Sequence, residues 1–201
     1  MEFQEVVRRR RMVRAFSPEP VAPDALERVL DNARRGPSAG FAQGTEFLVL
    51  DDADDRDAFW STALPSEERD QFPWQGVLTA PVLIAVVPGK DVYLDRYAEP
   101  DKGWADRDEA RWPAPFWDVD AGMAALLILL TTVDVGLGAL FFGLPPDRTA
   151  AVMERFAIPA ARRPVGFIAV GHRVTDRPSS SLRRGRRPLT EVVHRGRFSR
   201  G

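Results

Sequence analysis

Cysteine is absent from the 201 residues of this chain. Its absence excludes disulfide bonds, thiol nucleophiles, CxxC redox chemistry and cysteine-ligated metals. Histidine occurs only twice, as His172 and His194, so few imidazoles are available as a catalytic base or a metal ligand. No group of His, Asp and Glu has the spacing of metal ligands. We therefore expect a protein without a metal centre.

The chain also lacks a long uninterrupted apolar run. Its most apolar stretch, residues 119–135, contains Asp120, Thr131, Thr132 and Asp134, and it falls short of the ~20 residues that span a bilayer. This stretch is predicted to be a buried core helix. The N-terminus shows no charged segment followed by an apolar one, so we expect no signal peptide, no membrane association and a cytoplasmic location.

The chain also lacks an excess of charge of either sign. The 28 Lys and Arg are matched by 29 Asp and Glu, which gives a net charge of -1. Because nucleic-acid binders normally carry an overall basic balance, no nucleic-acid partner is expected. The basic residues are nevertheless concentrated at the two ends of the chain, at residues 8–14 and 183–187.

Arginine clusters of this kind suit a local phosphate site. A guanidinium group binds a phosphate through two parallel hydrogen bonds and keeps its charge at any working pH. Each cluster taken alone could be a solvated charge run. A phosphate site needs only a few arginines, however, and is compatible with a neutral overall balance. We interpret the two clusters as two halves of one phosphate clamp.

The length and apolar content fit a single domain of mixed α and β structure. Helices are expected around residues 3–7, from Pro23 to a stop at Gly36, and from about Phe116. Short apolar runs predict strands at residues 47–50, 82–87 and 165–170.

Two further segments show no clear period. Residues 88–115 are rich in Asp, Arg, Trp and Pro, and a segment of this length in a compact domain is usually a lid, a binding loop or disordered. Its aromatic residues argue against disorder. Residues after 175 form a polar extension that either folds back or reaches another subunit.

The stretch from Gly36 to Gly40 fits the pattern G-x-S-x-G, which exposes a nucleophilic serine on a strand-to-helix turn in α/β-hydrolases. Here the predicted order is reversed, with a helix before the motif and a strand after it, and Pro37 lies where the strained turn would form. A structural turn around Ser38 is therefore favoured, with a serine hydrolase as the alternative.

The stretch from Gly136 to Gly143 has the composition of a glycine-rich cofactor loop. It follows a helix rather than a strand and lacks the third glycine of G-x-G-x-x-G, so it is a weak dinucleotide fingerprint. The alternative is a helix end followed by a short buried strand. In both cases glycine lets the backbone approach a flat ligand closely.

Several segments, in the order and spacing in which they occur, resemble the FMN-dependent nitroreductase superfamily. Residues 10–16, RRMVRAF, are similar to the family's R-R-S-x-R-x-F, and Pro20-Val21 follows as its P-V. Residues 33–47 are similar to a helix ending in A-P-S-x-x-N-x-Q-P-W-x-F. The helix from Asp120 that runs into residues 136–138, and residues 185–193, resemble the family's middle and end. The likeness is weakest at residues 88–115.

The resemblance implies an α+β fold with a central, mostly antiparallel sheet flanked by helices, in an intertwined homodimer. It implies one nitroreductase-like domain over residues 1–201, with a lid or insert at about 88–115 and a C-terminal arm at about 175–201. FMN is expected at each of two subunit interfaces. NAD(P)H would reduce the flavin, which would then reduce a small-molecule acceptor in a ping-pong cycle. Since the flavin carries the chemistry, no catalytic side chain is expected.

The resemblance also assigns contacts to the flavin. The phosphate and the ribityl chain would be held by residues of both basic clusters: Arg10, Arg11, Met12, Arg14, Arg184 and Arg186. The partner subunit would contribute Pro37, Ser38 and Ala39. The backbone beside the flavin ring would be that of Leu140, Phe141, Phe142 and Gly143. Gln75 lies roughly where related enzymes supply a polar group to the pyrimidine edge.

Three departures from the family pattern concern the same site. Met12 replaces the usual serine and removes a hydroxyl donor near the phosphate. Phe41 replaces the usual asparagine, and Gly44-Thr45 replaces Pro-Trp, so the wall beside the flavin is altered.

Aromatic residues are expected to select a flat acceptor such as a nitroaromatic or a quinone. The candidates are Phe41, Tyr93, Tyr97 and Trp112. Those in the 88–115 segment could equally serve only to pack the dimer surface. Beside the serine hydrolase, the other alternative to a flavin enzyme is a non-catalytic phosphate- or anion-binding module, whose binding would depend steeply on salt.

Overall fold

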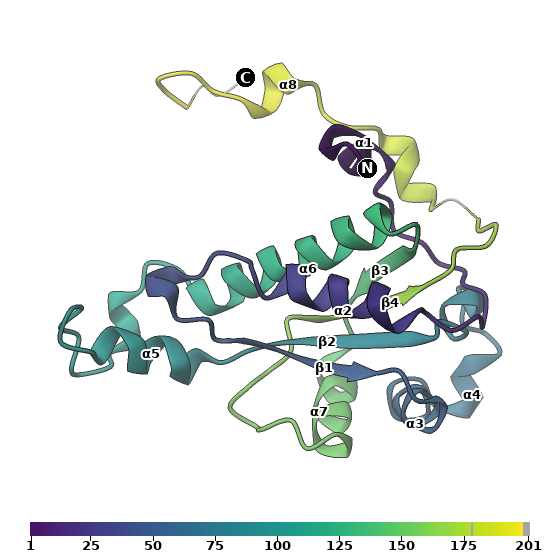
Figure 1. Cartoon of the computed structure of the whole chain (residues 1–201), viewed down its shortest axis with the longest axis horizontal. Helices are drawn as coiled ribbons and strands as arrows, with labels where there is room; N and C mark the ends of the chain where they lie inside the picture. The colour runs from purple at the N-terminus through teal and green to yellow at the C-terminus, as the bar shows by residue number, and fades with distance from the viewer. Residues whose placement is uncertain (178, 199–201) are drawn as a thin grey trace.

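The computed structural model describes residues 1–177 and 179–198. Its centre is a four-stranded sheet in the order β1-β2-β4-β3, in which every neighbouring pair is antiparallel (Figure 1). The strands are β1 Thr45–Leu50, β2 Val82–Pro88, β3 Gly138–Phe142 and β4 Gly166–Gly171. The strands predicted at residues 47–50, 82–87 and 165–170 are confirmed, as is the α+β class with an antiparallel sheet.

Helices surround the sheet on both faces. The described α-helices are α1 Phe3–Arg9, α2 Pro23–Ala33, α3 Ala53–Ala63, α4 Ser66–Arg69, α5 Lys90–Ala98, α6 Phe116–Asp134, α7 Pro146–Arg155 and α8 Leu189–Val192. The described 3-10 turns are η1 Ala39–Phe41, η2 Gln75–Val77, η3 Glu109–Arg111 and η4 Ser180–Arg184. Figure 1 shows α2 and α6 on one face of the sheet and α3 and α7 on the other.

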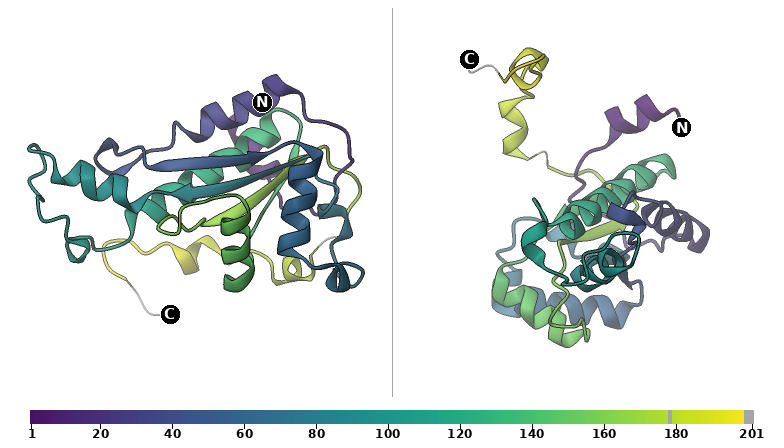
Figure 2. Two further views of the ribbon diagram at one scale, coloured as in Figure 1. Left: turned by 90° about the horizontal axis from the view of Figure 1, so that it is seen from below. Right: turned by 90° about the vertical axis from the view of Figure 1, so that its left-hand side faces the viewer.

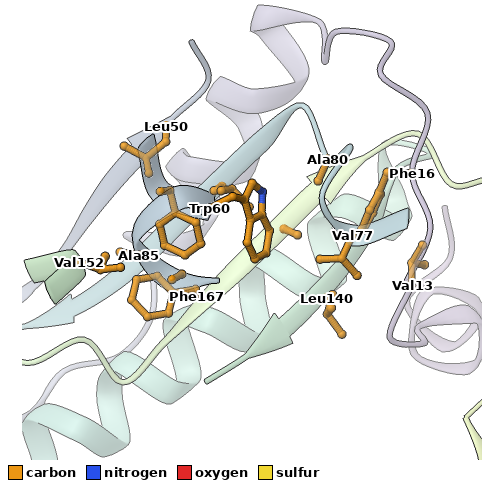
Figure 3. Packing of buried hydrophobic residues seen from close by; sticks show 14 of the residues in the cluster. Val13, Phe16, Leu50, Trp60, Val77, Ala80, Ala85, Leu140, Val152 and Phe167 are labelled. Atoms are coloured by element: carbon orange, nitrogen blue, oxygen red, sulfur yellow. The ribbon is translucent and has the colours of Figure 1, made fainter. Parts of the chain in front are cut away.

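The central strand β2 divides the core into two layers. Successive side chains of a strand point to opposite faces, so Val82, Ile84 and Val86 pack with α2 and α6. Leu83, Ala85 and Val87 pack with α3 and α7. Every residue of β2 is buried, which explains why its sequence is a continuous apolar run rather than an alternating one. Figure 3 shows the second layer, to which α3 contributes Trp60 and β4 contributes Phe167.

Helix α6 is the core helix that the sequence predicts. It contacts α2, β2 and β3, and it buries residues such as Ala121 and Ile128. By length and composition it is the one helix among the described residues that could also cross a membrane. Core helices pass the same test, and the packing of α6 between α2 and the sheet accounts for its apolar character.

Residues 88–115 are more ordered than the sequence suggests. The segment begins with α5, which contains nine residues, and continues through loops to η3. Aromatic side chains rather than an apolar stripe hold α5 in place, and this explains why no helical period is visible. The segment's role as a lid stays a prediction, as does the division of the chain into one domain and an arm.

The C-terminal arm leaves the body after β4 and runs outward, past α1 (Figures 1 and 2). Its large apolar side chains, Leu182, Leu189, Val192, Val193 and Phe198, are exposed. Residues 178 and 199–201 of the predicted arm lie outside the described part of the chain.

We expect Gly166→Ala to destabilise the fold. A β-carbon on Gly166 would lie 2.4 Å from Cζ of Phe141 on the neighbouring strand, and overpacking of this kind costs about 1–3 kcal/mol. Urea unfolding followed by circular dichroism measures the loss. Adding Phe141→Leu should restore part of it, and an unchanged midpoint in Gly166→Ala would contradict the packing described.

Candidate functional site

The arginine-bearing segment near the N-terminus is fixed to the edge of the sheet. The amide of Val13 donates to the carbonyl of Ala139 in β3, at 3.0 Å, and Ser17 donates to His172 beyond β4, at 2.9 Å. Val13 and Phe16 are buried. Gly138 is required at this contact, because a β-carbon there would lie 2.8 Å from Cγ2 of Val13. The segment therefore carries its arginines at a defined place beside β3.

Five arginines line a hollow of about 530 Å³ at one end of this segment. They are Arg8, Arg9, Arg10, Arg11 and Arg173, and Gly136 and Gly138 lie beside them. Arg9 pairs with Glu5 at 3.2 Å. None of the other four has a carboxylate partner within the part of the chain that the structure describes. This arginine hollow concentrates uncompensated positive charge and suits an anion.

A second hollow, of about 400 Å³, borders the other end of the segment and the end of β3. We call it the β3 hollow. Arg14 lines it together with Leu140, Phe141, Phe142 and Gly143, the four residues predicted to lie beside a flavin ring. A β-carbon on Gly143 would meet no atom within 4 Å, so the backbone is open to a close approach there.

Arg14 is held from both its backbone and its side chain. Its amide donates to Oδ2 of Asp176 at 2.9 Å, and its Nη1 donates to the carbonyl of Met12 at 3.3 Å. The guanidinium carbon lies 5.0 Å from the ring centroid of Trp74, within the range of a cation–π interaction. Contacts within the chain therefore fix the position of Arg14.

The two hollows have the chemistry expected at the two ends of the FMN that the sequence predicts. The arginine hollow supplies charge for a phosphate, and the β3 hollow supplies an apolar, partly aromatic surface for a ring. Both border one anchored segment of about seven residues. A larger hollow of about 810 Å³ lies elsewhere, between α2 and β1, and includes none of the predicted site residues.

The side chains of two residues predicted to contact the flavin bind other parts of the chain instead. Met12 lines neither hollow; its sulfur accepts a weak hydrogen bond from the amide of Phe141 at 3.5 Å, and its side chain packs against both core layers. Gln75 donates from Nε2 to the backbone carbonyls of Arg69 and Phe72. Gln75 does lie beside the arginine segment, because Phe16 donates to the carbonyl of Gly76 at 2.9 Å.

Arg184 and Arg186 are exposed on the C-terminal arm, and within the described residues no hydrogen bond or ion pair joins them to Arg10 or Arg14. Figure 2 shows the arm standing apart from the sheet. The described chain alone therefore does not assemble the two halves of the predicted phosphate clamp, whose closure stays a prediction.

Pro37, Ser38 and Ala39 begin a tight turn before β1. The hydroxyl of Ser38 accepts from the amide of Gln43 at 3.0 Å, and the amide of Ala39 donates to Oδ2 of Asp120 at 2.8 Å. A helix precedes the turn and a strand follows it, the opposite of a hydrolase elbow. The turn presents Phe41 outward with 75% of its surface exposed.

Asp120 is a buried carboxylate at the N-terminal part of α6. Its Oδ2 also accepts from the hydroxyl of Tyr93 at 2.9 Å, so two donors satisfy a charge that would otherwise be costly to bury. Burial raises the pKa of the Tyr93 phenol, and the hydrogen bond and charge of Asp120 raise the pKa further. Tyr93 therefore stays protonated at every physiological pH.

The predicted substrate-selecting aromatics occupy different environments. Tyr93 is fully buried and supports the turn through Asp120; its contact with an acceptor stays a prediction. Tyr97 and Trp112 pack with ring centroids 4.4 Å apart and with Trp104 form one aromatic cluster. Both are half-buried. Phe41 is the most accessible of the four.

Within the described residues, no group of three His, Asp or Glu side chains could hold a metal ion.

Comparison with known proteins identifies the family. The sequence profile of the nitroreductase family matches residues 7–172. The chain belongs to the nitroreductase family. This confirms the family and the oxidoreductase class that the sequence predicts.

Individual relatives agree with the family assignment. A "Putative NADH dehydrogenase/NAD(P)H nitroreductase" from Methanothermobacter thermautotrophicus is 26% identical over 174 residues, which are 86% of this chain and 78% of that protein. A Desulfovibrio desulfuricans nitroreductase solved in complex with FMN has 22% identity and a TM-score of 0.71, with 99% of each chain covered. Nitroreductase CinD from Lactococcus lactis, solved with nicotinic acid, has 18% identity and a TM-score of 0.71 over 89% of this chain and 93% of that one. The two structures show that the fold is shared.

Three residues of this nitroreductase-family site are not identified by sequence reasoning. Trp74 and Asp176 hold Arg14 from segments far away in the chain, and neither belongs to a motif. Asp120 does carry a signal, because a carboxylate inside an apolar helix has to be paired or ligated if it is buried. The sequence marks it only as an interruption of the apolar run.

We expect Tyr93→Phe to lower the free energy of unfolding by about 1–3 kcal/mol, because Asp120 keeps its burial and loses a donor. Urea unfolding at neutral pH measures this loss. Tyr97→Phe is the matched control, because the Tyr97 hydroxyl makes no hydrogen bond to the described residues. Equal stability of Tyr93→Phe and wild type would contradict the described contact.

The same pair predicts a dependence on pH. The pKa of Tyr93 is raised in the folded state, so above the ordinary pKa of about 10 the unfolded chain loses a proton that the folded chain keeps. Stability should therefore fall with rising pH, and more steeply in wild type than in Tyr93→Phe. Parallel stability profiles above pH ~10 would contradict this.

Proposed function

We propose that this nitroreductase-family chain is an FMN-dependent oxidoreductase that uses NAD(P)H to reduce flat acceptors such as nitroaromatics or quinones. The observation that carries the proposal is the pair of hollows on one anchored segment, one lined by arginines and the other by Leu140 to Gly143. FMN supplies hydride transfer when bound. The FMN in the Desulfovibrio protein and the nicotinic acid in CinD support the choice of cofactor and donor.

The chain's own residues bind and orient. Arg10, Arg11 and Arg14 would contact the phosphate and the ribityl chain, with Arg184 and Arg186 closing over the phosphate from the arm. The backbone from Leu140 to Gly143 would lie beside the ring, and the open space at Gly143 would admit a flat group. No described side chain is assigned a proton-transfer role. The proposed cycle is ping-pong, because donor and acceptor would use the same open face in turn.

A second copy of the chain completes the proposed site. Helix α6 exposes an apolar stripe that includes Val119 and Leu126, with 44% and 48% of their surfaces accessible, and α1 adds Phe3 and Val7. Unpartnered apolar surface of this kind is typical of an interface. The exposed turn at Pro37 to Phe41 is free to approach the partner's flavin. The homodimer thus accounts for the exposed apolar stripe, the turn and the extended arm together.

The first test is the visible spectrum of the purified protein, with chromatography of the chromophore released by heat. About one FMN per chain is expected, as is bleaching by NADH or NADPH under anaerobic conditions. A colourless protein that takes up no added FMN would refute the proposal.

We expect the double variant Arg14→Ala with Arg186→Ala to lose FMN while keeping its fold. Each substitution removes charge-assisted hydrogen bonds worth about 1.5–3 kcal/mol, so the affinity for FMN should fall at least about 100-fold. Quenching of FMN fluorescence on titration measures it. Arg28→Ala with Arg155→Ala removes two exposed arginines that line neither hollow and should bind FMN normally. Full FMN retention in the first variant would contradict the clamp.

The interface is tested with Leu126→Glu. Burying a carboxylate at the centre of an apolar stripe should prevent association, so the mass in sedimentation velocity should fall from dimer to monomer and FMN content should fall with it. Ala150→Glu on α7, an exposed position on the opposite face, is the control. A variant that remains dimeric would place the interface elsewhere.

A further inference from the structure

The turn that carries Phe41 has an unusual backbone. Gly40, Phe41 and Gln43 all have positive φ angles, of 61°, 56° and 54°. Left-handed conformations are uncommon for residues other than glycine, and they persist only where the surroundings impose them. Phe41 gains nothing from burial to offset this, because it is the most exposed large side chain of the turn. The surroundings of the turn therefore have to hold it.

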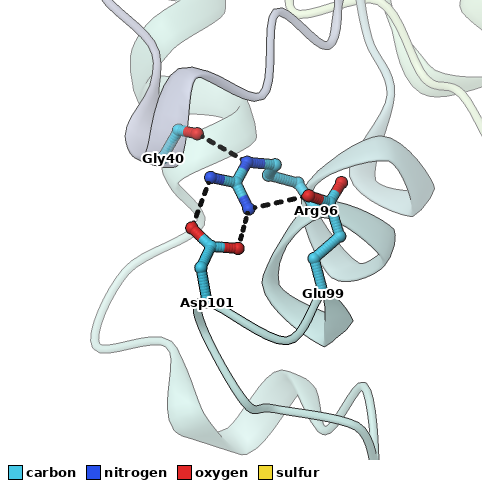
Figure 4. A network of polar contacts seen from close by, with 4 residues as sticks. All are labelled: Gly40, Arg96, Glu99 and Asp101. Atoms are coloured by element: carbon cyan, nitrogen blue, oxygen red, sulfur yellow. Dashed lines mark hydrogen bonds and ion pairs between the residues drawn. The ribbon is translucent and has the colours of Figure 1, made fainter.

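Arg96 of α5 supplies one of these restraints. Its Nε donates to the carbonyl of Gly40 at 2.9 Å (Figure 4). The rest of the guanidinium is fixed by a two-point contact with Asp101, at 2.7 and 2.8 Å, and by Glu99 at 3.0 Å. The hydrogen bond from Arg96 holds the pKa of Asp101 below its usual range. The two carboxylates thus fix the plane of the guanidinium so that Nε points at the turn.

Two further contacts restrain the same turn. Asp120 accepts from the amide of Ala39 and is itself held by Tyr93. The ring of Tyr97 lies against Gly40 so closely that a β-carbon there would be 2.7 Å from Cε2. Arg96, Tyr93 and Tyr97 all come from α5, so this helix holds the turn directly through Arg96 and Tyr97 and indirectly, through Asp120 of α6, by Tyr93.

We propose that Arg96 is a positioning residue that fixes the turn of residues 38–43, so that Phe41 projects at a constant place and determines which flat acceptors are admitted. The inference rests on the proposed function for its substrate class. It assigns the 88–115 segment a part in selectivity that does not require its own aromatics to touch the acceptor.

Steady-state kinetics test the claim. Arg96→Met keeps an apolar side chain of similar length but removes the guanidinium that donates to Gly40. The turn should therefore sample other conformations. We expect KM for acceptors to change by about threefold or more, with a changed ranking of a small quinone against a bulkier one. Rates are compared per bound FMN, because residues 37–39 of the same turn are also proposed to contact the partner's flavin.

Arg111→Met is the matched control. Arg111 makes the same two-point contact with a carboxylate, Asp106, within the same segment, and it does not touch the turn. A general loss of stability would affect both variants equally, whereas positioning affects only Arg96→Met. Equal acceptor kinetics in the two variants would overturn the proposal.

Phe41→Ala tests whether Arg96 affects acceptor selection through Phe41 or by another route. If Arg96 acts by placing Phe41, Arg96→Met should change the acceptor ranking in the wild-type background and leave it unchanged in Phe41→Ala. Additive effects of the two substitutions would overturn the proposal.

Hydrogen exchange tests the restraint without requiring turnover. The amides of Ala39, Phe41 and Gln43 are donors in the described turn and should exchange slowly in wild type and in Arg111→Met, and faster in Arg96→Met. Unchanged protection in Arg96→Met would refute the positioning role. A wild-type protein with slow exchange but no FMN would refute the proposed function and leave the restraint intact.

Discussion

The pairing of residues 12–17 with the ends of β3 and β4 is the contact on which the rest of the site depends. It buries Val13 and Phe16, and it uses the amide of Val13 and a glycine at position 138 to bring two backbones together. One segment thereby faces the arginine hollow and the β3 hollow at once. Without this pairing, the arginines would be a solvated charge run, and nothing would relate them to Gly143.

A second constraint comes from Asp120. Its single oxygen Oδ2 joins α6 to the turn of residues 38–43 and to α5. Helix α6 also carries the exposed apolar stripe that we assign to the dimer interface. Asp120 therefore couples the core helix, the turn with Phe41 and the 88–115 segment. A substitution that displaces one of them is expected to displace the others.

Apolar runs were sufficient to predict the central strands and the core helix, because β2, β4 and α6 owe their burial to their own side chains. Helix α3 gave no comparable signal: its apolar residues Phe59 and Trp60 are adjacent rather than spaced around a stripe. The family motifs placed the arginines and residues 140–143 in one region. They could not show that Met12 and Tyr93 face the interior, since both depend on contacts with distant segments. Trp74, Asp176 and Arg96 act through tertiary contacts that no local pattern encodes.

The central claim is that the anchored segment holds the phosphate of FMN while the end of β3 lies beside its ring. A crystal structure of the protein grown with FMN tests it most directly. The account predicts the phosphate within hydrogen-bond distance of Arg10 or Arg14, the ring against Leu140 to Gly143, and residues 37–41 of a second subunit nearby. A flavin bound in the hollow between α2 and β1, or one held entirely by a single protomer, would contradict it.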